Sequence, residues 1–299
     1  MLICGVLAAA AAGVARSPLP AQVSAGRHAP AKRLATLRDS RITEASGIAA
    51  GRQNPDVIWV HNDSGDEPRL FAVGYDGNTR AVVTVEGAKA VDWEDLAAAP
   101  GPDGRPSLYI ADTGNNERTR TDLCVYCIPE PDLSGGATEV RSERARVFPF
   151  RYPNGAHDCE ALMVHPHTRR VYLVTKEIIG RPARVFRFPQ PLTEGTVVTL
   201  EEIATVALPL PSIWGRMVTA ADIAPDGKHC VFRTYLSLLE FPLPAGEEFE
   251  AALRGKPLLI DGPPEIQGET VTYLANSRDL LTIGEGRGAP LHLISYRTR

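Results

Sequence analysis

One short pattern occurs five times along this chain: a polar residue, a spacer, a second polar residue, another spacer and an aliphatic residue. The copies are Glu44–Ile48, Asp92–Leu96, Asp158–Leu162, Thr219–Ile223 and Gln267–Val271. Side chains alternate across a strand, so each copy places its polar positions on one face at the start of a strand. The copies begin 48 to 66 residues apart, which is within or somewhat above the period of propeller blades. The repeat therefore predicts five similar β units stacked about one axis, with their polar strand starts around one mouth.

Each copy is followed by turn residues and by further strand-like segments rich in aromatic and β-branched side chains. Four-stranded units around an axis form a β-propeller, so we predict an all-β fold with five four-stranded blades. A sixth blade is the alternative if residues 130–157 or 187–218 contain a degenerate unit. The last unit ends after its third strand, and we expect residues 33–38 to supply its outer strand and close the ring. Residues 247–253 predict one helical turn within a loop.

The composition favours a single domain and excludes nucleic acid as a partner. The 25 prolines and 26 glycines are spread along the chain and are not gathered into a linker. The formal net charge is −4, and no basic stripe is present to neutralise phosphates. We expect a monomer with no stable membrane association.

The N-terminus resembles an export signal. Residues 2–15 form an apolar, alanine-rich run that is too short to span a bilayer, and Gly13 and Ala15 suit cleavage before Arg16. We therefore predict a signal peptide over residues 1–15, an unstructured lead-in over 16–32 and a propeller domain over 33–299, in a secreted or periplasmic protein. No basic residue precedes the run, which leaves open whether Met1 is the true start. The alternative is a cytosolic protein with a frayed tail.

Four cysteines lie beyond this segment. Cys124 and Cys127 are three residues apart in a strand pattern, so their side chains point to opposite faces and do not form a metal-binding pair. Cysteine is among the most buried residue types, which predicts buried free thiols. A disulfide between any two of Cys124, Cys127, Cys159 and Cys230 stays open.

In an antiparallel blade, the start of the first strand and the end of the second lie at the same end of the sheet. The sequence therefore predicts that many carboxylates meet at one mouth: Glu44, Asp63, Asp92, Glu94, Asp112, Asp158, Glu160, Glu177, Glu269 and Glu285. Such a group cannot remain ionised without positive charge nearby. The candidates are a divalent cation, Lys176 with Arg233, or both.

The oxygen-rich residues suit calcium. We expect Asp63, Asp92, Asp112, Asp158 and Glu269 to be metal ligands. The alternative is that Asp and Asn residues at these positions form Asx-turns at blade corners.

Four residues are predicted to carry the chemistry. Lys176 and Arg233 would hold an anionic group, with the alternative that both pair with neighbouring acids, and Glu94 or Glu160 would act as the base. A bound metal would polarise the ester and activate water. No motif for a serine or cysteine nucleophile is present. Trp59 and Trp93 are expected between blades, and Trp214 over the mouth.

Nine motifs, spread over residues 44–285, carry a family resemblance: Ser46–Ile48, His61–Gly65, Asp92–Leu96, Asp112–Asn116, Asp158–Leu162, Val174–Glu177, Val218–Asp222, Arg233–Tyr235 and Gln267–Glu269. With them the chain resembles a group of bacterial exported β-propeller proteins, some of them similar to esterases or phytases. The resemblance implies a propeller fold with an acidic axial mouth.

The sequence thus predicts an exported, calcium-dependent propeller hydrolase that acts on a small anionic ester, in particular a phosphoester. One alternative is a non-catalytic propeller that binds a metal, a sugar or a peptide at the same mouth. Another is an acidic ring that is purely structural and is stabilised by salt bridges.

Overall fold

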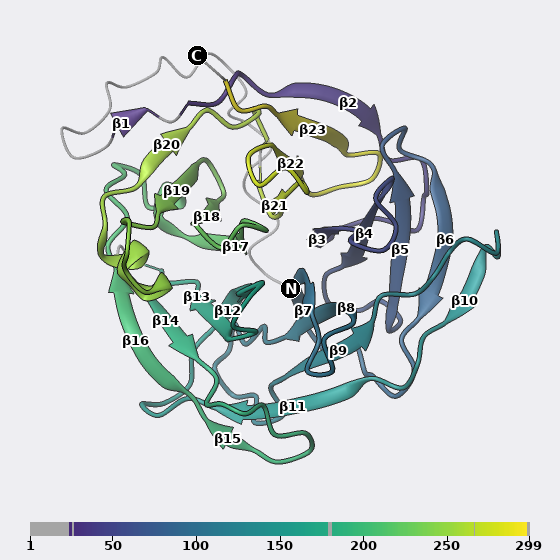
Figure 1. Cartoon of the computed structure of the whole chain (residues 1–299), viewed down its shortest axis with the longest axis horizontal. Coiled ribbons are helices and arrows are strands. Elements are labelled where there is room, and N and C mark those ends of the chain that lie inside the picture. Colours follow the sequence, from purple (N-terminus) through teal and green to yellow (C-terminus); the bar gives the residue numbers. More distant parts are fainter. Residues whose placement is uncertain (1–23, 26, 179–180, 266, 298–299) are drawn as a thin grey trace.

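Five β-sheets stand in a ring around one axis, as the repeat predicts (Figure 1). The structure is a computed structural model that describes residues 24–25, 27–178, 181–265 and 267–297. The fold is the predicted all-β, five-bladed propeller. The predicted signal peptide, residues 1–15, lies outside the described residues.

In blades 1 to 4 the strands follow one another in chain order from the axis to the rim. Blade 1 contains β3 (Ala45–Ala50), β4 (Val57–Asn62), β5 (Arg69–Gly74) and β6 (Thr79–Thr84). Blade 2 contains β7 (Trp93–Pro100), β8 (Pro106–Asp112), β9 (Cys124–Pro129) and β11 (Arg146–Arg151). Blade 3 contains β12 (Cys159–Val164), β13 (Val171–Thr175), β14 (Ala183–Arg187) and β16 (Glu201–Val206). Blade 4 contains β17 (Val218–Ile223), β18 (His229–Thr234), β19 (Leu238–Pro242) and β20 (Leu258–Ile260).

Blade 5 joins the two ends of the chain. It contains β21 (Thr272–Tyr273), β22 (Leu280–Ile283) and β23 (Pro290–Ile294), and its outer strand is β2 (Lys32–Thr36). β2 pairs antiparallel with β23 at the rim of the ring (Figure 1). The predicted closure by residues 33–38 is therefore confirmed, with the strand beginning one residue earlier.

The two long stretches that left a sixth blade open reinforce existing blades. Residues 130–157 contain β11 and also β10 (Glu139–Arg141), which pairs in parallel with β6 of blade 1. Residues 187–218 contain β16 and also β15 (Val198–Thr199), which pairs in parallel with β11 of blade 2. These short strands cover the outer edges, which would otherwise expose unpaired backbone groups.

The lead-in is structured where it is described, contrary to our expectation for residues 16–32. β1 (Ser24–Ala25) pairs in parallel with β20, and His28 forms a β-bridge with Tyr296. These contacts satisfy backbone groups on the outer edge of blade 4 and near the C-terminus. This pairing explains why these residues have a defined structure.

The core lies between neighbouring blades. Trp59 and Trp93 are both fully buried in the cluster between blades 1 and 2, as predicted. The four described cysteines are free and buried, which confirms the free-thiol prediction. The described helical segments are two short 3-10 turns, η1 (Trp214–Arg216) and η2 (Phe249–Arg254), and neither is long and apolar enough to cross a bilayer. The second is the predicted helical turn in a loop.

Hydrogen bonds to two buried carboxylates connect the blades beside the axis. Asp95 on β7 accepts from the N–H of Leu162 in blade 3 (2.8 Å) and of Ala221 in blade 4 (3.1 Å). Asp222 on β17 accepts from the N–H of Tyr273 in blade 5 (2.8 Å). These donors lie on innermost strands, whose axial edge has no neighbouring strand to pair with.

The hydrogen bonds of Asp95 and Asp222 form a polar girdle around the axis, and this girdle continues into blade 1. The hydroxyl of Thr272 donates to Asp222 (3.0 Å) and accepts from the N–H of Ala50 (3.2 Å). Burial raises the pKa of Asp95 well above its usual range and that of Asp222 to about 6, although the N–H donors oppose the shift. All five blades thus share one buried polar girdle.

We expect Asp95→Ala to destabilise the protein by about 3 kcal/mol or more, because each buried N–H left without an acceptor costs about 1–3 kcal/mol. Asp95 also accepts from the N–H of Leu96, so three donors are affected. Asp95→Asn keeps one carbonyl acceptor and should lose less. Asp56→Ala, at an exposed position, is the control in urea unfolding. Equal midpoints for Asp95→Ala and Asp56→Ala would contradict the role of the girdle.

Candidate active site

Each innermost strand contains one extra residue near its start. The register shifts between Ala45 and Gly47 and at the equivalent points of β7, β12 and β17, which makes Ser46, Glu94, Glu160 and Thr219 the bulged residues. In blade 5, Gly268 pairs with Gly284 and Thr272 with Leu281, so the extra residue lies in the segment that contains Glu269. A β-bulge bends the strand and re-aims its side chain. The three acids at these positions all line the axial mouth.

The bulges correct the alignment of the fourth repeat. Our pattern placed Thr219 in register with Glu44, Asp92 and Asp158. In the structure Thr219 takes the place of Glu94 and Glu160, so Met217 corresponds to Asp92 and Asp158. The fourth blade therefore has no carboxylate at either position.

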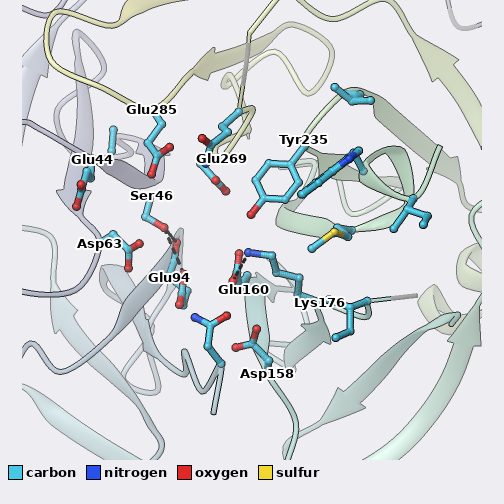
Figure 2. A pocket seen from close by; sticks show the side chains of 18 residues that line it. Glu44, Ser46, Asp63, Glu94, Asp158, Glu160, Lys176, Tyr235, Glu269 and Glu285 are labelled. Atoms are coloured by element: carbon cyan, nitrogen blue, oxygen red, sulfur yellow. Dashed lines mark hydrogen bonds and ion pairs between the residues drawn. The ribbon is translucent and has the colours of Figure 1, made fainter. Parts of the chain in front are cut away.

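A cavity of about 480 Å³ opens at this mouth. Seven carboxylates line it: Glu44, Asp63, Glu94, Asp158, Glu160, Glu269 and Glu285. Among the described lining residues Lys176 is the one cation, and Figure 2 shows it near the centre with acids on several sides. Ser46, Asn116, Gln267 and Tyr235 add uncharged polar groups.

The remaining side of the cavity is an apolar wall. Its residues are Ile178, Ile213, Trp214, Met217 and Leu236. They come from the chain that follows β13, from the segment around η1 and from the turn between β18 and β19. Trp214 lies at the mouth, as predicted.

Two groups of three carboxylates are close enough to share a cation. Asp63, Asp92 and Glu94 form one group, and Glu94, Asp158 and Glu160 form the other, each with ligand oxygens within 4.8 Å of one another. Glu94 belongs to both groups and is buried. An all-oxygen donor set of this kind suits calcium or magnesium.

Gly114 allows two of these acids to converge. A Cβ at this position would lie 2.1 Å from Oε1 of Glu94 and 2.4 Å from Oδ2 of Asp92. Any side chain would therefore displace both carboxylates, so the absence of a side chain at Gly114 is needed for Asp92 and Glu94 to approach each other.

Lys176 forms an ion pair inside the cavity. Its Nζ lies 2.5 Å from Oε1 of Glu160 and 4.9 Å from the ring centroid of Tyr235. Burial lowers the pKa of Lys176, but the nearby Glu160 and the other acids outweigh that effect and hold it well above its usual value. Lys176 is thus a charged ammonium group that is paired with Glu160.

Burial raises the pKa values of the carboxyls around it. The pKa of Asp92 rises to about 6, through burial first and the neighbouring Asp63 second, and burial raises that of Glu269 to about 8 although Lys176 opposes the shift. Burial also raises the pKa values of Glu94 and Glu160 well above the usual range; Glu160 adds to the shift of Glu94, whereas Lys176 opposes that of Glu160. One ammonium cannot neutralise seven carboxylates, so further positive charge would be stabilised strongly here.

Arg233 does not line the cavity, contrary to our expectation. Its guanidinium is 1% exposed and pairs with Glu265 at 2.7 Å beneath the mouth. The strand register gives the reason: Arg233 pairs with Ala220 as Val174 pairs with Ala161, which places it one layer deeper than Lys176. Arg233 also packs against Gly268, next to Glu269, where a Cβ would lie 1.6 Å from Nη2.

Two of the predicted acids also face away from the cavity. Asp112 pairs with Arg120 in the loop after β8 at 2.7 Å and accepts from the N–H of Asp92, which precedes β7, at 3.1 Å, and it does not line the cavity. Glu177 is on the far side of Lys176, where it helps to line a second cavity of about 130 Å³. Successive residues after β13 point in opposite directions, which explains the separation of Lys176 from Glu177.

Tyr235 is the site residue that sequence reasoning missed. It follows β18 as Lys176 follows β13, because Thr234 and Thr175 hold equivalent positions in the register. Its ring contacts both Lys176 and Trp214, and the ring centroid of Trp214 lies 5.8 Å away. An alignment of the ends of β13 and β18 would have identified Tyr235 as the counterpart of Lys176. Our search for positively charged residues at strand ends selected Arg233 instead.

No protein-family model matches this chain, and no curated protein matches it at a significant level. Among solved structures, the chain is similar to a gluconolactonase from Xanthomonas campestris, with 12% identity, coverage of 94% of this chain and 99% of that chain, and a TM-score of 0.50. It is also similar to an auxiliary nutrient binding protein from Bacteroides thetaiotaomicron, with 11% identity, coverage of 90% and 76%, and a TM-score of 0.47. At such identities the likeness to the gluconolactonase shows the propeller fold alone.

The raised pKa of Glu269 predicts that stability depends on pH when cations are chelated. A carboxyl with a raised folded pKa stabilises the native state fully below its ordinary value of 4.5 and loses that contribution as the pH rises through about 8. We expect Tm in chelator to fall between about pH 4.5 and 8 and to level off above that range. Glu269→Gln should flatten part of this fall, whereas Glu139→Gln, at an exposed position, should not. Parallel Tm profiles for the two variants would contradict the assignment.

Proposed function

We propose that this cavity is the active site of a calcium-dependent hydrolase that acts on a small anionic ester. The observation that carries the proposal is the buried Glu94, which lines the cavity and belongs to two groups of three carboxylates. Buried carboxylates at such density are costly unless a cation compensates them. An acidic ring held only by its own salt bridges would need more cations than Lys176 among the described lining residues.

The residues present fit a calcium ion. Asp63, Asp92 and Glu94, or Glu94, Asp158 and Glu160, supply oxygen ligands, and Gly114 leaves the room they need to converge. Glu269 and Asn116 line the same cavity and add oxygen donors. When bound, calcium would polarise the ester oxygen and lower the pKa of water. The export predicted from residues 1–15 accords with calcium sites of the weak extracellular kind.

The side chains of this protein would divide the remaining work. Lys176 would hold the anionic group of the substrate, because its ammonium is buried in the cavity and stays charged. Glu160 and Glu94 are the candidates to accept the proton of the attacking water, since both are buried in the cavity and have raised pKa values. Tyr235 lines the cavity beside Lys176, and its hydroxyl would donate to a substrate oxygen.

Hydrolysis is favoured over simple binding by the combination of a cation site, a candidate base and an ammonium in one cavity. The fold likeness to a gluconolactonase from Xanthomonas campestris is compatible with an ester or lactone bond as the target. Phosphoesters remain the first anionic esters to test, since calcium and lysine both bind phosphate oxygens.

Calcium should raise the melting temperature of the chelated protein, because a ligand that binds only the folded state stabilises it. We expect a rise of several degrees at millimolar calcium and a strong reduction of this rise in Glu94→Gln. Glu139→Gln is the matched control, since Glu139 is exposed on β10. A calcium response that is unchanged in Glu94→Gln would contradict the shared-ligand assignment, and no response in the native protein would remove the metal from the proposal.

Lys176→Met should lower kcat/KM for anionic esters by about tenfold to a hundredfold, the value of a charge-assisted hydrogen bond of about 1.5–3 kcal/mol. Neutral esters of the same shape should lose less. Lys256→Met, at an exposed position, is the control. Equal losses on neutral and anionic esters would show that Lys176 does not hold the anion. Calcium binding without turnover on any ester would favour the non-catalytic propeller.

A further inference from the structure

The apolar wall gathers most of the exposed large hydrophobic side chains of the described residues. Among the described residues seven large hydrophobic side chains are exposed, and four of them, Ile178, Ile213, Trp214 and Leu236, line this one cavity. Their exposed fractions are 49%, 49%, 40% and 52%. Apolar surface concentrated in one concave place marks a binding site and not the ordinary scatter of surface hydrophobics.

The wall lies where the repeat departs from its acidic pattern. Met217 occupies the position of Asp92 and Asp158, and Thr219 that of Glu94 and Glu160. After β18, Tyr235 and Leu236 replace the charged pair Lys176 and Glu177 of blade 3. The substitutions fall in one blade, so the cavity is divided into an acidic half and an apolar half.

Tyr235 connects the two halves. The centroid of its ring lies 4.9 Å from the ammonium of Lys176 and 5.8 Å from the ring centroid of Trp214. A molecule bound at Lys176 would therefore have its next atoms beside Tyr235 and its far end against Trp214 and Leu236. The cavity volume of about 480 Å³ suits a small molecule and not a protein segment.

We propose that the substrate is an amphiphile, in which the anionic ester group lies in the acidic half and an alkyl or aryl group packs on the apolar wall. The inference rests on the proposed function for the identity of the anionic end, while the apolar half is carried by the wall itself. Burial of an alkyl chain is worth about fourfold in affinity per methylene. The wall would thus set specificity, and the acidic half would set reactivity.

Trp214 provides a direct binding signal. It is the exposed tryptophan, whereas Trp59 and Trp93 are fully buried. We would titrate n-alkylphosphonates, which are not hydrolysed, from methyl to octyl in the presence of calcium and follow tryptophan emission. The expected result is a shift of the emission to the blue and a Kd that falls by about threefold to fourfold per methylene over the first members of the series. Trp214→Phe should remove the emission change.

Serine variants of the wall test its role in binding. Leu236→Ser and Ile213→Ser should flatten the dependence of Kd on chain length while leaving the Kd for methylphosphonate within about twofold. Both positions are exposed, so the fold should tolerate the changes. Leu34→Ser, at a position on β2 that is 38% exposed and outside the cavity, is the matched control and should keep the full dependence.

A Kd that does not change with chain length, or the same slope in Leu236→Ser and Leu34→Ser, would overturn the inference. A dimer that Leu236→Ser dissociates in sedimentation velocity would overturn it as well, since the wall would then belong to a second copy. Neutral n-alkanols titrated in chelator separate the two proposals. A chain-length dependence there supports the apolar half even if calcium and turnover fail, and its absence sinks the apolar half even if turnover is found.

Discussion

The innermost strand of every blade has one edge that faces the axis, where no further strand is present to pair with it. Its N–H groups are buried, and buried donors need acceptors. Asp95 and Asp222 provide them across blade boundaries, and Thr272 extends the connection to Ala50 in blade 1. The closed ring thus depends on ionisable groups kept in its centre. Asp95 directly follows Glu94, so the strand whose hydrogen bonds connect the blades also positions the acid that belongs to both carboxylate groups.

The bulge at the start of each innermost strand converts this architecture into a site. It turns one side chain per blade toward the mouth, and the residue at that point differs between blades: Ser46, Glu94, Glu160, Thr219 and Glu269. A symmetric scaffold therefore presents an asymmetric cavity. Three of these residues are acids whose burial raises their pKa values, and Lys176 alone opposes them among the described lining residues. The unbalanced charge makes a cation the natural complement.

Much of the fold could be predicted from the chain. Turn residues between short aromatic and β-branched segments indicated the blades, and the missing last strand indicated closure by the N-terminal residues, which β2 and β23 confirm. The reinforcing strands β1, β10 and β15 could not be predicted, because they are two or three residues long and exist only through pairing with distant strands. The gathering of Glu94, Asp158 and Glu160 was predicted, whereas their mutual distances depend on Gly114 and the bulges.

The sequence by itself determined the propeller, the blade count within one and the acidic character of the mouth, because alternation and turn chemistry are local properties that a strand carries wherever it lies. Only the tertiary structure decided which polar residue faces the cavity. A single inserted residue reverses the face of all that follows it, and no local pattern reveals where the bulge falls. The pairing of β17 with β18 also decides that Arg233 is buried against Glu265, while Tyr235, two residues later, meets Lys176. The apolar wall likewise exists only because Ile178, Trp214 and Leu236, distant in sequence, converge on the same cavity.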